Sequence, residues 1–75
     1  MSGWDTQEAA RRAWAAYSYV ARVLPADANL EAIGRADSAV LEAEEAGDWR
    51  GYVEALRELC RTARREAIRR RGRAA

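Results

Sequence analysis

Apolar residues recur every three or four positions along this 75-residue chain, in three segments separated by a proline and a glycine. This spacing is typical of amphipathic helices. The first segment predicts a helix at residues 6–24, because Asp5 and Glu8 have the spacing of a capping box and Pro25 disfavours helical backbone just before it. The apolar face of this helix is predicted to contain Ala10, Ala13, Trp14, Tyr17, Val20, Ala21 and Leu24.

The second segment predicts a helix at residues 29–46. Either Asp27 or Asn29 is suited to cap its start. Gly47 is suited to end it, since glycine readily adopts the left-handed conformation that follows many helices. The predicted core residues of this helix are Leu30, Ile33, Val40 and Leu41.

The third segment predicts a helix at residues 49–71, capped by Asp48 and ended by Gly72. No segment alternates apolar and polar residues as a strand does, and the second connection is very short. The sequence therefore predicts an all-α fold, a small antiparallel three-helix bundle that forms one domain over residues 1–75. The third helix is the longest, so we expect its C-terminal end to project past the bundle.

Asp37 is a carboxylate on the face of the second helix that is predicted to be buried. A buried carboxylate needs a hydrogen-bond or ion-pair partner. Residue counts from the two turns place Asp37 opposite Trp14 and Tyr17 of the first helix. They also place it opposite Arg57 and Arg61 of the third. We therefore expect Asp37 to be a structural buried polar residue that fixes the register of the helices.

Charge is distributed unevenly, although the formal net charge is only +1. Residues 27–58 contain nine carboxylates and three arginines, whereas residues 59–75 contain seven arginines and one glutamate. A ridge of arginines along one helix can bind a phosphate backbone. The predicted nucleic-acid-binding residues are Arg57, Arg61, Arg64, Arg65, Arg69, Arg70 and Arg71. The same cluster suits an acidic protein surface, and pairing with nearby glutamates would instead make it a solvated face.

Small residues form a second candidate surface on the middle helix. Ala32, Ala36, Ala39 and Ala43 are spaced as a heptad seam, which lets another helix approach closely. With Tyr19, which is expected on the outer face of the first helix, they predict an interface for a homodimer or a larger protein. The alternative is that the seam packs inside the bundle, because a middle helix contacts both of its neighbours.

Several kinds of chemistry lack their usual residues. The sequence has no histidine, a single cysteine and no glycine-rich phosphate loop, so we expect no metal, no cofactor and no enzymatic activity. No apolar run is long enough to predict a membrane span, and the cysteine and N-terminal sequence favour the cytoplasm. The abundance of alanine and arginine with no lysine suggests a GC-rich bacterial or phage genome. The leading hypothesis is a non-enzymatic accessory factor that binds nucleic acid, and the alternative is a protein-interaction module or small subunit.

Overall fold

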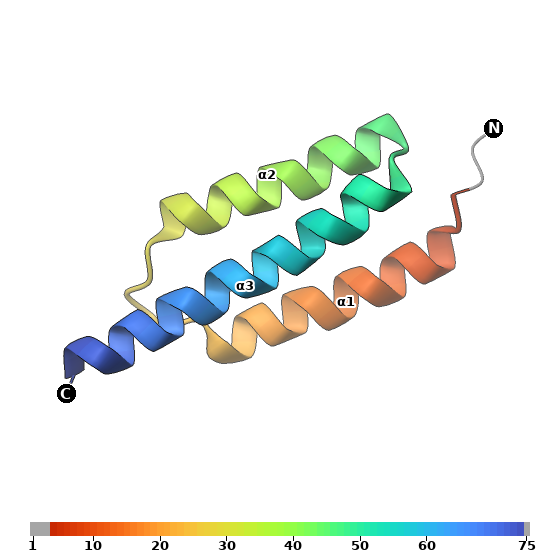
Figure 1. Cartoon of the computed structure of the whole chain (residues 1–75). Helices are drawn as coiled ribbons and strands as arrows, with labels where there is room; N and C mark the ends of the chain where they lie inside the picture. Colours follow the sequence, from red (N-terminus) through yellow and green to blue (C-terminus); the bar gives the residue numbers. More distant parts are fainter. Residues whose placement is uncertain (1–3, 75) are drawn as a thin grey trace.

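The chain folds into three long helices that run antiparallel in sequence order (Figure 1). The computed structural model describes the backbone of residues 4–74, and their side chains except at positions 70, 73 and 74. α1 spans Thr6–Val23, α2 spans Leu30–Ala46 and α3 spans Trp49–Ala74, and no strand occurs within residues 4–74. The predicted all-α antiparallel three-helix bundle is confirmed.

Side-chain caps begin the helices where the sequence indicates. Asp5 accepts hydrogen bonds from the backbone N–H groups of Gln7 and Glu8. Asn29, and not Asp27, caps α2 by accepting from the first residues of that helix. These side chains satisfy N–H groups that have no partner inside the helix.

Of the two glycines predicted to end helices, one does so and the other does not. Gly47 has φ 67°, the left-handed conformation predicted for the end of α2. Asp48 then accepts from the N–H of Gly51 at 3.0 Å and begins α3. Gly72 does not end α3, which continues to Ala74, because one glycine lowers helix propensity by only about 1 kcal/mol.

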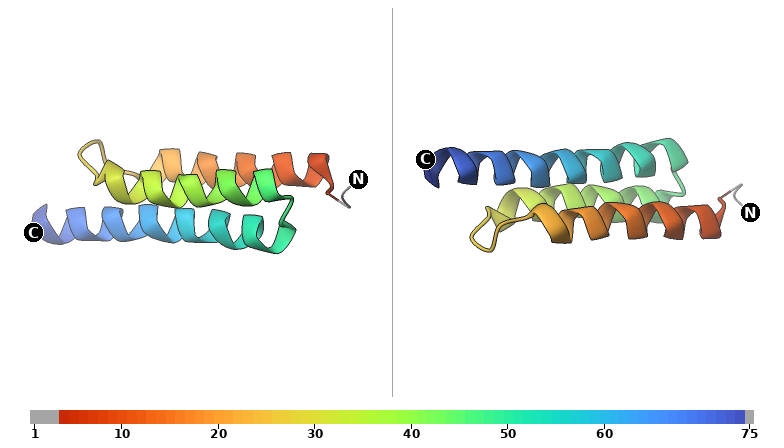
Figure 2. Two further views of the ribbon diagram at one scale, coloured as in Figure 1. Left: turned by 90° about the horizontal axis from the view of Figure 1, so that it is seen from above. Right: turned by 90° about the horizontal axis from the view of Figure 1, so that it is seen from below.

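α3 is the helix that both of the others contact: it lies between them in Figure 1, and α1 and α2 lie on the same side of it in Figure 2. Both α1 and α2 pack along it, whereas no Cα of α1 lies within 8 Å of a Cα of α2. The middle helix in sequence is therefore not the middle helix in space. This arrangement leaves one side of α1 and one side of α2 uncovered by the rest of the chain.

Small residues build much of the core along α3. Leu59 is its largest fully buried side chain, and Ala63 is completely buried. The buried apolar set is Ala9, Ala16, Val20, Ala36, Val40, Tyr52, Ala55, Leu56, Leu59 and Ala63. Because half of these are alanines, the outer helices can approach α3 closely, and Cys60 packs against both halves of the core.

Aromatic rings close the end of the bundle where α3 begins. Trp4 packs edge-on against Trp49 and Tyr52, with ring centroids 5.3 and 5.0 Å apart. The buried hydroxyl of Tyr52 donates to the backbone oxygen of Ala9 at 3.1 Å. These contacts join the segment before α1 to α3, as edge-to-face aromatic pairs commonly do in cores.

Candidate interaction surfaces

The predicted arginine ridge lies on the exposed side of α3, but glutamates of the same helix neutralise much of it. The ion pairs are Arg57 with Glu54, Arg61 and Arg65 with Glu58, and Arg69 with Glu66, all at 3.0–3.1 Å. Arg64 and Arg71 are exposed and form no ion pair within the described residues, and the side chain of Arg70 lies outside them. The ridge therefore presents less positive charge than the sequence suggests.

Glu58 is the one of these carboxylates that pairs with two arginines. Hydrogen bonds from Arg65 and then from Arg61 lower its pKa below the ordinary value. Exposed pairs of this kind contribute little to stability, and their arginines can exchange partners with a ligand at small cost.

Glu66 differs from the other glutamates of α3 because its side chain is buried. Its Oε1 accepts from the backbone N–H of Asn29 at 3.1 Å, and its Oε2 accepts from Arg69. This carboxylate therefore connects the start of α2 to α3. Arg69 is occupied by a structural contact and is the least available member of the ridge.

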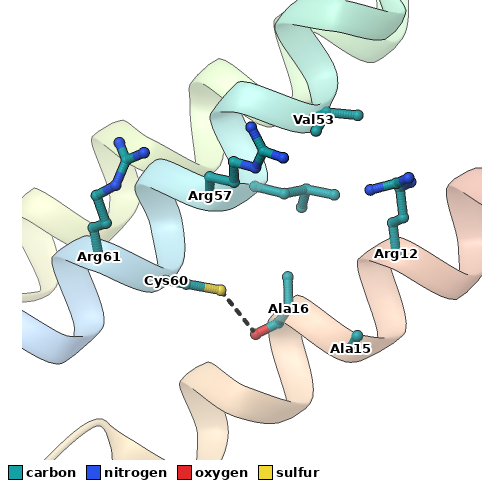
Figure 3. A pocket seen from close by; sticks show the side chains of 8 residues that line it. Arg12, Ala15, Ala16, Val53, Arg57, Cys60 and Arg61 are labelled. Atoms are coloured by element: carbon teal, nitrogen blue, oxygen red, sulfur yellow. Dashed lines mark hydrogen bonds between the residues drawn. The ribbon is translucent and has the colours of Figure 1, made fainter.

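A groove of about 450 Å³ runs between α1 and α3 on the side away from α2 (Figure 3). Its floor is apolar, formed by Ala15, Ala16, Val53, Leu56 and Cys60. Arg12 of α1 lies on one rim, and Arg57 and Arg61 of α3 lie on the other (Figure 3). The sequence pattern places Arg57 and Arg61 in the ridge, but the groove and the contribution of Arg12 follow only from how α1 packs on α3.

Two contacts hold the walls of this groove in place. The Sγ of Cys60 lies 3.8 Å from the backbone oxygen of Ala16, and burial raises the pKa of its thiol. The guanidinium of Arg12 lies over the ring of Trp49, 5.6 Å from its centroid, and pairs with Glu8 at 3.0 Å. Arg12 is therefore held at the rim by an aromatic ring and a carboxylate.

The opposite side of α1 forms an open apolar face with α2. We use the name α1–α2 face for the exposed residues Trp14, Tyr17, Leu30 and Leu41. Trp14 is 77%, Leu30 68% and Leu41 53% exposed, so the prediction that these three are core residues is wrong. The apolar sector of α1 is wider than one neighbouring helix can cover, and α3 covers only the part that contains Ala9, Ala16 and Val20.

One side-chain hydrogen bond spans this face. The hydroxyl of Tyr17 donates to Oδ1 of Asp37, which confirms one of the predicted partners. Asp37 is half-buried and not fully buried, because α1 and α2 stay apart at this level. The pKa of Tyr17 is raised well above its ordinary value, mainly by partial burial and secondly by the hydrogen bond to Asp37.

The alanine seam faces mainly inward. Ala36 is buried in the core and Ala43 packs against it, so these two cannot form the predicted interface with another protein. Ala32 is half-buried, and only Ala39 is exposed. Tyr19 is half-buried as well, with the guanidinium of Arg22 over its ring at 5.9 Å from the centroid. The alternative in which the seam packs inside the bundle describes its buried members better.

Two further kinds of site are absent from the described part of the chain. Across residues 4–74, no group of three or more metal-ligating side chains is assembled. None of the helices there has the length and hydropathy needed to cross a bilayer. No protein family, curated protein or solved structure matches this chain, so its function must be argued from its own surfaces.

Proposed function

We propose that this chain is a non-enzymatic protein-interaction module that binds an acidic, amphipathic helical segment of a partner in the groove between α1 and α3. The observation that carries this proposal is the combination of an apolar floor with three rim arginines from two helices. Leucine-like side chains would cover the floor, and carboxylates on the flanks of the segment would meet Arg12, Arg57 and Arg61. A groove that accepts one face of an amphipathic helix is a recurrent mode of peptide recognition.

A nucleic acid fits the same arginines less well. Phosphates gain nothing from an apolar floor, and Glu54 and Glu58 lie beside the arginines that would have to bind them. The favourable features for nucleic acid are the exposed Arg64 and Arg71, together with the eight helical residues that follow the anchoring residue Glu66. If the helix end extends past the bundle, those residues would supply a small basic site. Binding of nucleic acid is therefore the alternative hypothesis that the experiment below distinguishes.

The proposal includes a cytoplasmic location. The only cysteine of the chain, Cys60, contributes to the floor of the groove as a thiol, and a reducing compartment would keep it so.

The experiment measures binding of a fluorescent synthetic peptide as long as α1, with leucines on one helical face and glutamates on both flanks. A scrambled peptide of the same composition and a short DNA duplex serve as comparison ligands. In the protein, the double variant Arg57→Gln/Arg61→Gln removes two rim charges. Its matched control, Arg64→Gln/Arg71→Gln, removes the same charge away from the groove.

We expect the amphipathic peptide to bind, the scrambled peptide to bind weakly, and the rim variant to lose about tenfold or more in affinity, since hydrogen bonds between charged groups contribute about 1.5–3 kcal/mol each. The control should bind as the original chain does. Occupancy should also slow the reaction of Cys60 with a thiol reagent. Equal losses in both double variants, with tighter binding to DNA and a steep salt dependence, would instead establish the nucleic-acid hypothesis.

A further inference from the structure

The α1–α2 face lies on the other side of the molecule from the groove, and no described part of the chain covers it. A soluble protein seldom exposes several large apolar side chains together on one face. Aromatic residues are also typical of the centres of protein interfaces. Here Tyr17 from α1 and Leu41 from α2 line a second hollow of about 320 Å³. Trp14 is exposed on α1, about one helical turn before Tyr17. On α1, the residues that line this hollow carry no charge.

We propose that the α1–α2 face is the interface of a symmetric homodimer, in which α1 of each copy packs antiparallel against α2 of the other. The two-fold axis runs parallel to the helices, so α1 and α2 of the two copies together form a four-helix bundle at the interface. A symmetric interface requires a self-complementary surface. The next observations show that this face has such complementarity.

The hydrogen bond between Tyr17 and Asp37 sets which residues of α1 and α2 lie at the same level. Because the helices are antiparallel, each residue forward along α1 corresponds to one residue backward along α2. Trp14 is therefore level with Val40, beside Leu41, and Arg22 is level with Ala32. A two-fold axis parallel to the helices preserves these levels, so Trp14 of one copy meets Leu41 of the other.

The charges at the outer edges of the face are complementary at these same levels. On α1, Arg11 and Arg22 lie on the side of Trp14 away from Tyr17, given the rotation of about 100° per helical residue. On α2, Glu31 and Glu45 lie on the corresponding side of Leu41. When α1 opposes α2 of the second copy, Arg22 meets Glu31 within one residue of the same level. Arg11 meets Glu45 within two.

Other arrangements lack this complementarity. If α1 opposed α1 of the second copy, the two pairs of arginines would face each other. Within the described residues, Glu45 and Arg22 form no ion pair, and the Arg22 guanidinium lies over the ring of Tyr19. Arg11 and Glu31 have exposed partners on their own helices, Glu8 and Arg35, at 3.3 and 3.6 Å. A second copy of this chain therefore supplies opposite charges at matched positions, which is the basis for choosing it as the occupant.

Gly34 gives an independent indication of close approach from outside. It lies in the interior of α2, where glycine costs about 1 kcal/mol relative to alanine. A Cβ added at Gly34 would meet nothing within 4 Å, so the fold of a single chain does not require a glycine there. On the helical wheel Gly34 lies next to Leu41, on the side toward Glu45, so it would face α1 of the second copy.

The experiment measures the dissociation constant of the dimer by analytical ultracentrifugation of the full chain over a wide concentration range. Arg22→Glu and Glu31→Arg each place like charges opposite each other, and the double variant Arg22→Glu/Glu31→Arg restores the pair. Gly34→Leu blocks close approach without a clash inside the chain. The matched control is Ala39→Leu, which adds the same side chain on another side of α2. Circular dichroism verifies that each variant is folded.

We expect a dimer for the original chain, about tenfold or greater weakening in each single charge reversal, recovery in the double variant, and a monomer for Gly34→Leu. Ala39→Leu should dimerise normally. A monomeric original chain at the highest concentration would overturn the proposal. A double variant that dimerises no more tightly than the single variants would also overturn it. So would a dimer that only Ala39→Leu disrupts, because that result would identify the alanine seam as the interface. Peptide binding in the groove does not depend on either result.

Discussion

The two sides of α1 contain similar proportions of apolar residues and yet have different structural roles. The side toward α3 is lined by Ala9, Ala16 and Val20, and it is buried. The side toward α2 carries Trp14 and Tyr17, and it is open. Small side chains let two helices approach until their backbones are in close contact. Large side chains hold α1 and α2 apart, so their apolar surface stays exposed and can contact another protein. On α1, the size of the apolar residues separates the side that is buried in the core from the side that forms the candidate interface.

The largest expected effect comes from the closed side. Leu59→Ala should destabilise the fold by about 2–5 kcal/mol, because Leu59 is only 1% exposed and its truncation leaves a cavity beside α3. The matched change Leu41→Ala, on the open face, should cost far less in dilute protein. Urea unfolding measures both.

A concentration series sharpens the same comparison. If Leu41 contributes to a dimer, the cost of Leu41→Ala should grow with protein concentration, while that of Leu59→Ala stays nearly constant. Similar costs for the two variants in dilute protein would mean that the α1–α2 face is part of the core.

An intermediate effect is expected at the hydrogen bond that spans the open face. Tyr17→Phe removes the donor to Asp37 and should cost about 0.5–1.5 kcal/mol. Tyr19→Phe is the control, since the Tyr19 hydroxyl has no hydrogen bond within the described residues. The folded chain raises the pKa of Tyr17, so it retains a proton that the unfolded chain loses near pH 10.

The sign of the pH dependence follows from this difference. The contribution of Tyr17 is fully present below about pH 10 and declines as pH rises above it, because the unfolded state then binds fewer protons. The stability difference between the original chain and Tyr17→Phe should therefore narrow in alkaline solution, as measured by urea unfolding at several pH values. A constant difference up to strongly alkaline pH would show that the hydroxyl does not act through this hydrogen bond.

Local signals predicted the fold well. The caps Asp5, Asn29 and Asp48 and the left-handed Gly47 depend on nearby residues, so the sequence was sufficient to place most helix boundaries. Gly72 was misassigned because its weak helix-breaking tendency is overcome by the helix around it.

The surfaces were harder to predict because they depend on which helix lies between the other two. Helical periodicity places Trp14 and Leu41 on apolar faces, but it does not say which part of a wide face a neighbour covers. The signal available in the sequence was the width of that face in α1. The partner of Asp37 was predictable because residue counts from a turn fix the level of facing residues, whereas the opposition of Arg12 to Arg57 depends on the rotation of α1 about its axis.

The smallest effect on stability is expected at the arginine ridge. Glu58→Gln removes the acceptor of Arg61 and Arg65, but these are exposed pairs, so the melting temperature should change little. The pKa of Glu58 is lowered in the folded chain. Its contribution is therefore present above the ordinary glutamate pKa and is lost as pH falls through the lowered value. Any stabilising effect should disappear in acid and shrink in high salt.

The same variant tests whether the rim of the groove is available to a ligand. Releasing Arg61 from Glu58 should tighten binding of the acidic amphipathic peptide severalfold, because the arginine no longer has to exchange partners. Glu31→Gln, which removes a carboxylate of α2 that is also paired with an arginine of its own helix, should leave peptide affinity nearly unchanged. If Glu58→Gln instead unfolds the bundle or weakens the peptide, the Glu58–Arg61 pair is structural. Arg61 would then be held by Glu58 and not available to a ligand. In that case the open α1–α2 face would be the surface of this chain that is best suited to bind a partner.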